Sequence, residues 1–147
     1  MSQDKENQLR RIVSEMQMME GSVQVLEQRS QLLGANIQEL RLAQTSLNSL
    51  KTVDEGTPIL VPVGGSVFIN SAIGELEKVI VGVGASVSVE MSYAKAVEEV
   101  NARLEELEKA MASVQEQLGQ ILAQLETHQG MAERLSADLQ NAIQGVG

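Results

Sequence analysis

The side chains that could carry out chemistry are few, and they lack the partners that such chemistry needs. His128 is the only histidine, and the chain contains no cysteine. A structural zinc site needs about four nitrogen, sulfur or oxygen ligands, and nucleophilic catalysis needs a nucleophile, a base and a group that orients the base. The sequence contains no recognisable pattern for such a set of metal ligands or for such a set of catalytic groups. We therefore expect no metal site, no cofactor and no enzymatic activity.

Acidic clusters and glycine pairs are the remaining candidates for chemistry. Glu98-Glu99 and Glu105-Glu106, with Glu108, have the spacing of a solvated helix face. Gly64-Gly65 and Gly82-Val83-Gly84 lie between short apolar runs and lack the lysine and the hydroxyl residue of a phosphate-binding loop. We interpret the first group as helix surface and the second as turns.

Two long stretches of apolar residues have steps that alternate between three and four, and we call these positions the seam. A contact face that repeats every 3.5 residues is typical of a coiled coil. The sequence predicts helices at about 5–51 and 93–144, with Ser92 as the N-cap of the second. The first seam comprises Leu9, Ile12, Met16, Met19, Val23, Leu26, Ser30, Leu33, Ile37, Leu40, Gln44 and Leu47. The second comprises Val97, Val100, Leu104, Leu107, Met111, Val114, Leu118, Ile121, Leu125, His128, Ala132, Leu135 and Leu139.

The two seams match each other when the helices run antiparallel. The alignment in which the numbers of paired residues add to 144 joins Leu40 to Leu104 and places His128 opposite Met16. A shift by one heptad fits nearly as well. A polar residue on a seam specifies the alignment or lies near a frayed end, and we interpret His128 in this way.

The segment 57–91, between the helices, predicts two β-hairpins. Gly64-Gly65 and Gly84-Ala85 each separate two short apolar runs, and two-residue loops with glycine favour tight hairpin turns. With these loops, Val61 faces Phe68, and Ile80 faces Val89. Both faces of the first hairpin are largely apolar, and open strand edges favour pairing with other chains. We expect an obligate oligomer whose assembly surface comprises Ile59, Leu60, Val61, Val63, Val67, Phe68, Ile69, Val79, Ile80, Val81, Val83, Val87 and Val89. A small β-domain that folds back on its own helices is the alternative.

This central segment resembles the α-subunit family of prefoldin. The run Pro58-Ile-Leu-Val-Pro-Val-Gly-Gly resembles the first strand and turn of that family, and the run from Lys78 to Glu90 resembles its second hairpin. The fold class is therefore mainly α with a small β region: a long antiparallel coiled-coil helical hairpin joined by two central β-hairpins. The resemblance implies that these hairpins assemble into a β-barrel core with two α-type and four β-type subunits.

The resemblance also implies a function. Prefoldin is an ATP-independent co-chaperone of the cytoplasm that holds non-native client proteins at the ends of its coiled coils and delivers them to a group II chaperonin. In this chain Leu139 would face Lys5, so apolar groups near the C-terminus lack apolar partners. The candidate client-binding residues are Leu9, Ile12, Met16, Met19, Met131, Leu135, Leu139, Ile143 and Val146. A frayed terminus with incidental apolar residues is the alternative interpretation.

Charge and hydropathy exclude other classes of partner. The net charge is −9 and no basic stripe is present, so we expect no nucleic-acid binding. No apolar run is long enough for a membrane span. We expect residues 1–147 to form a single prefoldin-like domain. The alternative function is a structural coiled-coil scaffold or a filament-forming, prefoldin-like protein.

Overall fold

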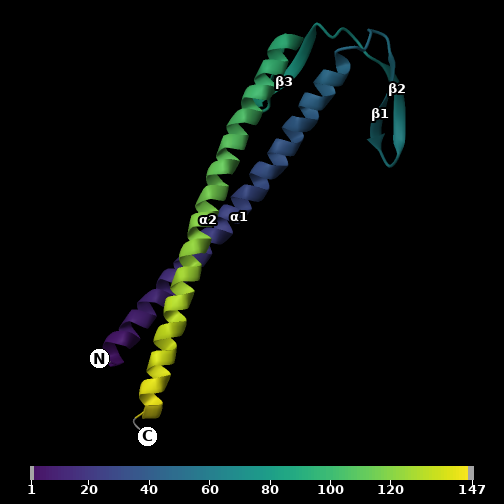
Figure 1. Cartoon of the computed structure of the whole chain (residues 1–147). Helices are drawn as coiled ribbons and strands as arrows, with labels where there is room; N and C mark the ends of the chain where they lie inside the picture. The colour runs from purple at the N-terminus through teal and green to yellow at the C-terminus, as the bar shows by residue number, and fades with distance from the viewer. Residues whose placement is uncertain (1, 146–147) are drawn as a thin grey trace. The chain divides into compact units, whose positions relative to one another are not determined.

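The computed structural model describes residues 2–145. The chain contains two long helices, α1 (Ser2–Leu50) and α2 (Tyr93–Gly145), which are labelled in Figure 1, and four strands between them in sequence. The strands are β1 (Pro58–Gly64), β2 (Val67–Ala72), β3 (Lys78–Gly84) and β4 (Val87–Ser92). They form two separate two-stranded antiparallel sheets, β1–β2 and β3–β4. The predicted fold class is confirmed, with two long helices and two small β-hairpins.

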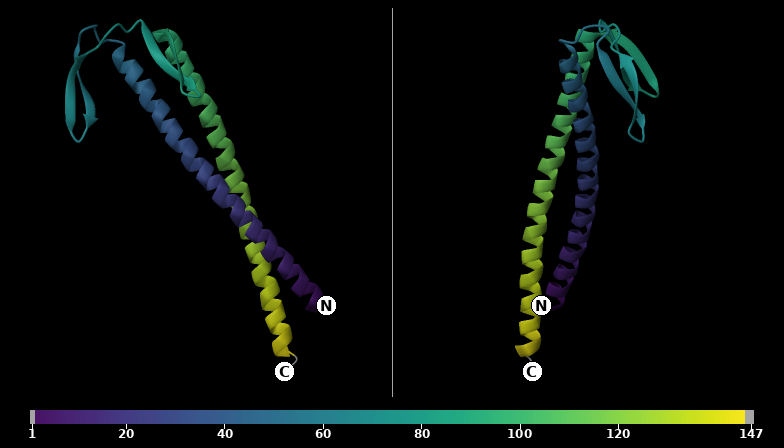
Figure 2. Two further views of the ribbon diagram at one scale, coloured as in Figure 1. Left: turned by 180° about the vertical axis from the view of Figure 1, so that it is seen from behind. Right: turned by 90° about the vertical axis from the view of Figure 1, so that its right-hand side faces the viewer.

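The chain forms two compact units. The unit that we call distal, because it is built from the two ends of the sequence, contains the first part of α1, up to Ala35, and the last part of α2, from Lys109. Its helices run antiparallel, because Nζ of Lys5 lies 3.6 Å from Oδ2 of Asp138, so the start of α1 meets the end of α2 (Figure 2). The hairpin unit spans Asn36–Glu108 and contains both sheets.

The helices pair through the predicted seam in each unit. Ile12, Leu26 and Val114 are buried in the distal unit, and Ile37, Val100 and Leu104 in the hairpin unit; all six are seam residues. The remaining seam positions are half-buried, except Gln44, which is exposed. Ala96, beside the seam, is fully buried and was not predicted.

Polar contacts between the helices fix their alignment. Glu15 contacts His128, and Gln44 donates a hydrogen bond of 2.7 Å to the side-chain oxygen of Asn101. The residue numbers in these pairs add to 143 and 145, close to the predicted 144. A heptad shift would separate each pair by about 10 Å along the helix axis, so it is excluded.

Both hairpin turns differ from the prediction by one residue. The two central residues are Gly65-Ser66 and Ala85-Ser86, with φ values between 51° and 61°, as a type I′ turn requires. Gly64 and Gly84, with φ of 109° and 106°, precede the turns, and an irregularity in each ladder lies just before them. The predicted pairs Val61–Phe68 and Ile80–Val89 are therefore wrong.

The observed register changes which side chains share a face. Val61 pairs with Ile69, and Val81 pairs with Val89. Because successive residues of a strand point to opposite faces, a slip of one residue moves every side chain of one strand to the other face. The extra residue between Pro62 and Gly64, and the one between Gly82 and Gly84, cause this slip. Neither the composition nor the length of the apolar runs reveals these extra residues.

Candidate functional site

The apolar side chains of the β1–β2 hairpin are exposed on both faces. One face carries Ile59, Val61 and Ile69, which are 36%, 39% and 53% exposed. The opposite face carries Leu60 and Phe68, which are 63% and 54% exposed. Val63 and Val67, beside the turn, are also exposed. A two-stranded sheet with two apolar faces cannot cover either of them by itself.

The β3–β4 hairpin has one apolar face and one polar face. Val79 pairs with Met91 and Val81 with Val89, and these side chains share one face, on which Val87 also lies. Val83, next to the irregularity, and Val87 are about half exposed. Val79, Val81 and Met91 are half-buried. Met91 was missing from the predicted surface because the predicted register stopped at Glu90.

Ile80 lies on the other face of this hairpin. It pairs with Glu90, its side chain is 77% exposed, and Lys78, Ser88 and Ser92 share its face. The predicted register had paired Ile80 with Val89 and so had placed it on an apolar face. The observed register makes it a lone apolar residue on a polar surface, which is common on soluble proteins.

The candidate client-binding residues differ in burial. Ile12 is only 4% exposed, because it packs between the helices. Ile143, in the last turns of α2, is 75% exposed. Val146 lies outside the described residues. The other candidates are half-buried, and they are Leu9, Met16, Met19, Met131, Leu135 and Leu139.

His128 joins the two helices of the distal unit through a charged contact. Its Nε2 lies 2.9 Å from Oε2 of Glu15, and Nε of Arg11 donates to the other carboxylate oxygen at 3.1 Å. The hydrogen bond to Glu15, and then the one to the main-chain carbonyl of Gln124, raises the pKa of His128, while burial opposes this shift. The hydrogen bonds from His128 and Arg11 lower the pKa of Glu15.

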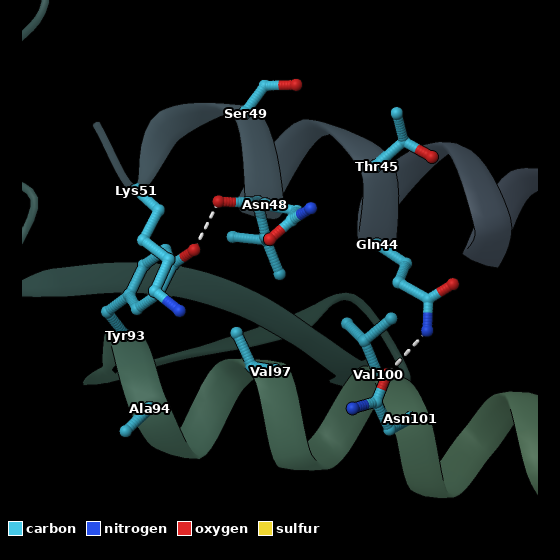
Figure 3. Close-up of a pocket in the computed structure, with 11 residues that line it drawn as sticks. Gln44, Thr45, Asn48, Ser49, Lys51, Tyr93, Ala94, Val97, Val100 and Asn101 are labelled. Atoms are coloured by element: carbon cyan, nitrogen blue, oxygen red, sulfur yellow. Dashed lines mark hydrogen bonds between the residues drawn. The ribbon is translucent and has the colours of Figure 1, made fainter. Parts of the chain in front are cut away.

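A groove of about 690 Å³ lies between the end of α1 and the start of α2 in the hairpin unit (Figure 3). Leu47, Val97 and Val100 line it with apolar surface, and the Gln44–Asn101 hydrogen bond crosses it. Its ionisable side chains are Lys51 and Tyr93. The apolar residues of this lining provide packing surface between the two helices.

Tyr93 closes the groove and was missed by the sequence analysis. Its hydroxyl donates a hydrogen bond to the carbonyl oxygen of Leu47, and its main-chain N–H donates to the carbonyl of Glu77 at 3.1 Å. Tyr93 therefore connects α1, the linker between the two hairpins (residues 73–77) and α2. Extending the second seam four residues before Val97 reaches Tyr93, so the signal was present. The predicted cap is confirmed, since Ser92 Oγ accepts a hydrogen bond from the N–H of Lys95.

The linker between the hairpins is acidic. A hydrogen bond with Glu77, together with the negative charges of Glu77, Glu55 and Glu90, raises the pKa of Glu75. Across residues 2–145, the acidic and histidine side chains form no group that could hold a metal ion. Neither α1 nor α2, over the described residues, is apolar enough along its length to cross a bilayer.

Comparison with known proteins identifies the family to which this chain belongs. The sequence profile of the family described as "Prefoldin subunit" matches residues 19–138. The chain belongs to the prefoldin family. The match begins within α1 and ends within α2, so it includes both β-hairpins. The resemblance of the central segment to prefoldin is thereby confirmed, and the relatives below confirm it for the α subunit.

Several relatives in this family are α subunits of archaeal prefoldin. The chain is 31% identical over 116 residues to prefoldin subunit alpha of Methanopyrus kandleri, covering 79% of this chain and 74% of that protein. It is also 31% identical over 134 residues to prefoldin subunit alpha of Pyrococcus horikoshii, covering 90% and 88%. Among solved structures, filamentous PFD of Methanocaldococcus jannaschii matches with a TM-score of 0.65 and 26% identity. That match covers 78% of this chain and 94% of that chain.

Proposed function

We propose that this chain is an ATP-independent chaperone subunit that assembles with other prefoldin subunits through its β-hairpins. The distal unit then captures non-native proteins, and the complex delivers them to a group II chaperonin in the cytoplasm. Family membership supports the co-chaperone class. The observation that carries the proposal is the exposed apolar surface of the hairpins, which this folded chain by itself leaves uncovered.

The assembly surface has two parts. Both faces of the β1–β2 hairpin contribute, because Leu60 and Val61 point to opposite faces and are both exposed. Only the Val81 face of the β3–β4 hairpin contributes, and Ile80 is therefore outside the surface. Partner strands would cover these faces and satisfy the open strand edges, in a complex of two α-type and four β-type subunits.

The client-binding surface lies at the free end of the distal unit. Ile143 is the most exposed of the described candidates, and half-buried Leu139 and Leu135 continue its surface along α2. Met16, Met19 and Met131 add adaptable apolar groups. Ile12 contributes only where the helices separate, because it is buried between them. Several arms that bind one client together give avidity from weak individual contacts.

Two measurements test this function separately. Co-expression with a β-type prefoldin subunit should give a hexamer by native mass spectrometry, and a chain that stays alone would contradict the assembly part. The hexamer should slow aggregation of a denatured client, and the double change Leu139→Ser and Ile143→Ser should remove most of that protection. Leu122→Ser is the matched control, because Leu122 is also in the distal unit and is 51% exposed.

A filament-forming scaffold is the second candidate function. The structural relative from Methanocaldococcus jannaschii is described as filamentous, and the hairpins here offer the apolar surface that end-to-end assembly would need. In this case the end of the distal unit would bind no client protein. Light scattering of the chain alone and with a β-type subunit separates the two functions, because a scaffold alone grows with concentration, whereas a chaperone subunit reaches a closed size only with its partner.

A further inference from the structure

His128 lies between two oxygen atoms that can only accept hydrogen bonds. Its Nε2 lies 2.9 Å from a carboxylate oxygen of Glu15 on α1, and its Nδ1 lies 2.9 Å from the main-chain carbonyl oxygen of Gln124 on α2. A neutral imidazole has one N–H and one lone pair, whereas an imidazolium donates from both nitrogens. Only the protonated ring therefore satisfies both contacts at once.

We propose that His128 is a pH-sensitive clamp between α1 and α2 in the distal unit. The protonated ring joins the Glu15 carboxylate to the main chain of α2. When the proton leaves, one nitrogen turns a lone pair towards an oxygen atom at 2.9 Å, and that contact is lost. If the Nε2 proton leaves, the lost contact is the one that joins the helices.

The charged groups that face the ring come from α1. Glu15 makes the direct contact, and the Arg11 side chain neutralises the same carboxylate through its other oxygen. Gln124 of α2 presents an uncharged carbonyl group. The His128 side chain is 20% exposed and that of Glu15 is 39% exposed. Water therefore reaches the pair and weakens its attraction, but the ring is sufficiently enclosed to hold one orientation.

The direction of the pH dependence follows from the two titrating groups. Because the folded pKa of His128 is raised above 6.5, its stabilising contribution is complete below about pH 6.5 and is lost as the pH rises through the raised pKa. Because the pKa of Glu15 is lowered below 4.5, its contribution is complete above about pH 4.5 and is lost on further acidification. The clamp thus has both of its hydrogen bonds between about pH 4.5 and 6.5, and it is weakened at higher pH, where the neutral ring can keep only one of them.

Nuclear magnetic resonance of the full, untagged chain tests the clamp directly, since its single histidine gives an unambiguous signal. We expect both ring nitrogens to be protonated at pH 6 and the titration midpoint to lie above 6.5. Glu15→Gln should move the midpoint down towards 6.5. Glu108→Gln is the matched control, because it removes the 3.0 Å Arg41–Glu108 ion pair between the same helices and should leave the midpoint unchanged.

Thermal unfolding at pH 6 and pH 8 supplies a second measurement. The loss of thermal stability between pH 6 and pH 8 should be larger for the wild-type chain than for the His128→Gln variant. A wild-type midpoint at or below 6.5, or one that Glu15→Gln leaves unchanged, would overturn the proposal. The wild-type titration decides even if a variant fails to fold. Neither measurement involves a client or a partner subunit, so the outcome is independent of the proposed function.

Discussion

Replacing Val81 or Ile80 by serine tests which face of the β3–β4 hairpin is covered when subunits assemble. The two residues are neighbours in β3, so both changes have the same sequence context. Val81 lies on the apolar face, opposite Val89, and Ile80 lies on the polar face, opposite Glu90. The predicted register would instead have paired Ile80 with Val89, so the two registers give different results.

The expected magnitude follows from the burial of each side chain. Full burial of a valine contributes about 1.5–3 kcal/mol relative to exposure. Val81 is already half-buried within the chain, so assembly should add about half of this value. An unpaired serine hydroxyl in the covered surface costs about 1–3 kcal/mol more. Together these terms give about 2–4 kcal/mol, which is roughly a 30- to 700-fold weaker association.

Sedimentation velocity with a β-type prefoldin subunit measures this association, and circular dichroism checks that each variant keeps its helices. Val81→Ser should shift the midpoint of assembly by the factor given above. Ile80→Ser should change it by less than about threefold, because a surface substitution typically changes the free energy by about 0.5 kcal/mol or less. Equal losses for the two variants would refute the assignment of faces. Val89→Ser should behave as Val81→Ser does, since Val89 faces Val81.

Three further predictions concern the fold and use thermal or urea unfolding of the full chain. Ala85→Gly should stabilise the chain by about 1 kcal/mol, because Ala85 has a φ of 51°. The control Ala102→Gly, in the interior of α2, should destabilise the chain by about as much. A free-energy change of the same sign for both variants would contradict the turn geometry. Tyr93→Phe should cost about 1–3 kcal/mol because the carbonyl of Leu47 loses its donor, and no loss would mean that water replaces the hydroxyl. Val114→Ala should cost about 2 kcal/mol, because Val114 is 2% exposed and two carbon atoms are removed, and a cost near zero would show that the seam is loosely packed there.

The pairing of the helices followed from local pattern. Alternating steps of three and four put one side of each helix in contact with the other, and the burial of Ile12, Leu26 and Val114 agrees with that pattern. Gly64-Gly65 and Gly84-Ala85 marked the hairpins, because few residues other than glycine tolerate positive φ. These signals are properties of neighbouring residues along the chain, so the sequence is enough to read them.

The face of each strand could not be read in this way. Gly64 and Gly65 both have positive φ, and the sequence does not say which of them begins the two-residue turn. Moving the turn by one residue alone would shift each partner by two and keep the faces, but the extra residue before Gly64 and Gly84 shifts the partners by one and moves a whole strand to the other face. Ile80 was placed on the wrong side for this reason, and Met91 was left out of the apolar face.

The sequence by itself determined two paired helices, two hairpins and the family of the chain, because periodicity and turn residues are recorded in short stretches. Only the tertiary structure decided what each polar side chain contacts. The sequence placed His128 on the seam opposite Met16, and the structure shows that its hydrogen-bond partner is Glu15. Tyr93 had no role assigned from the sequence, and the structure shows that its hydroxyl donates a hydrogen bond to the carbonyl oxygen of Leu47. A hydrogen bond depends on the distance between two atoms and on their directions, and these are set by the way distant segments pack.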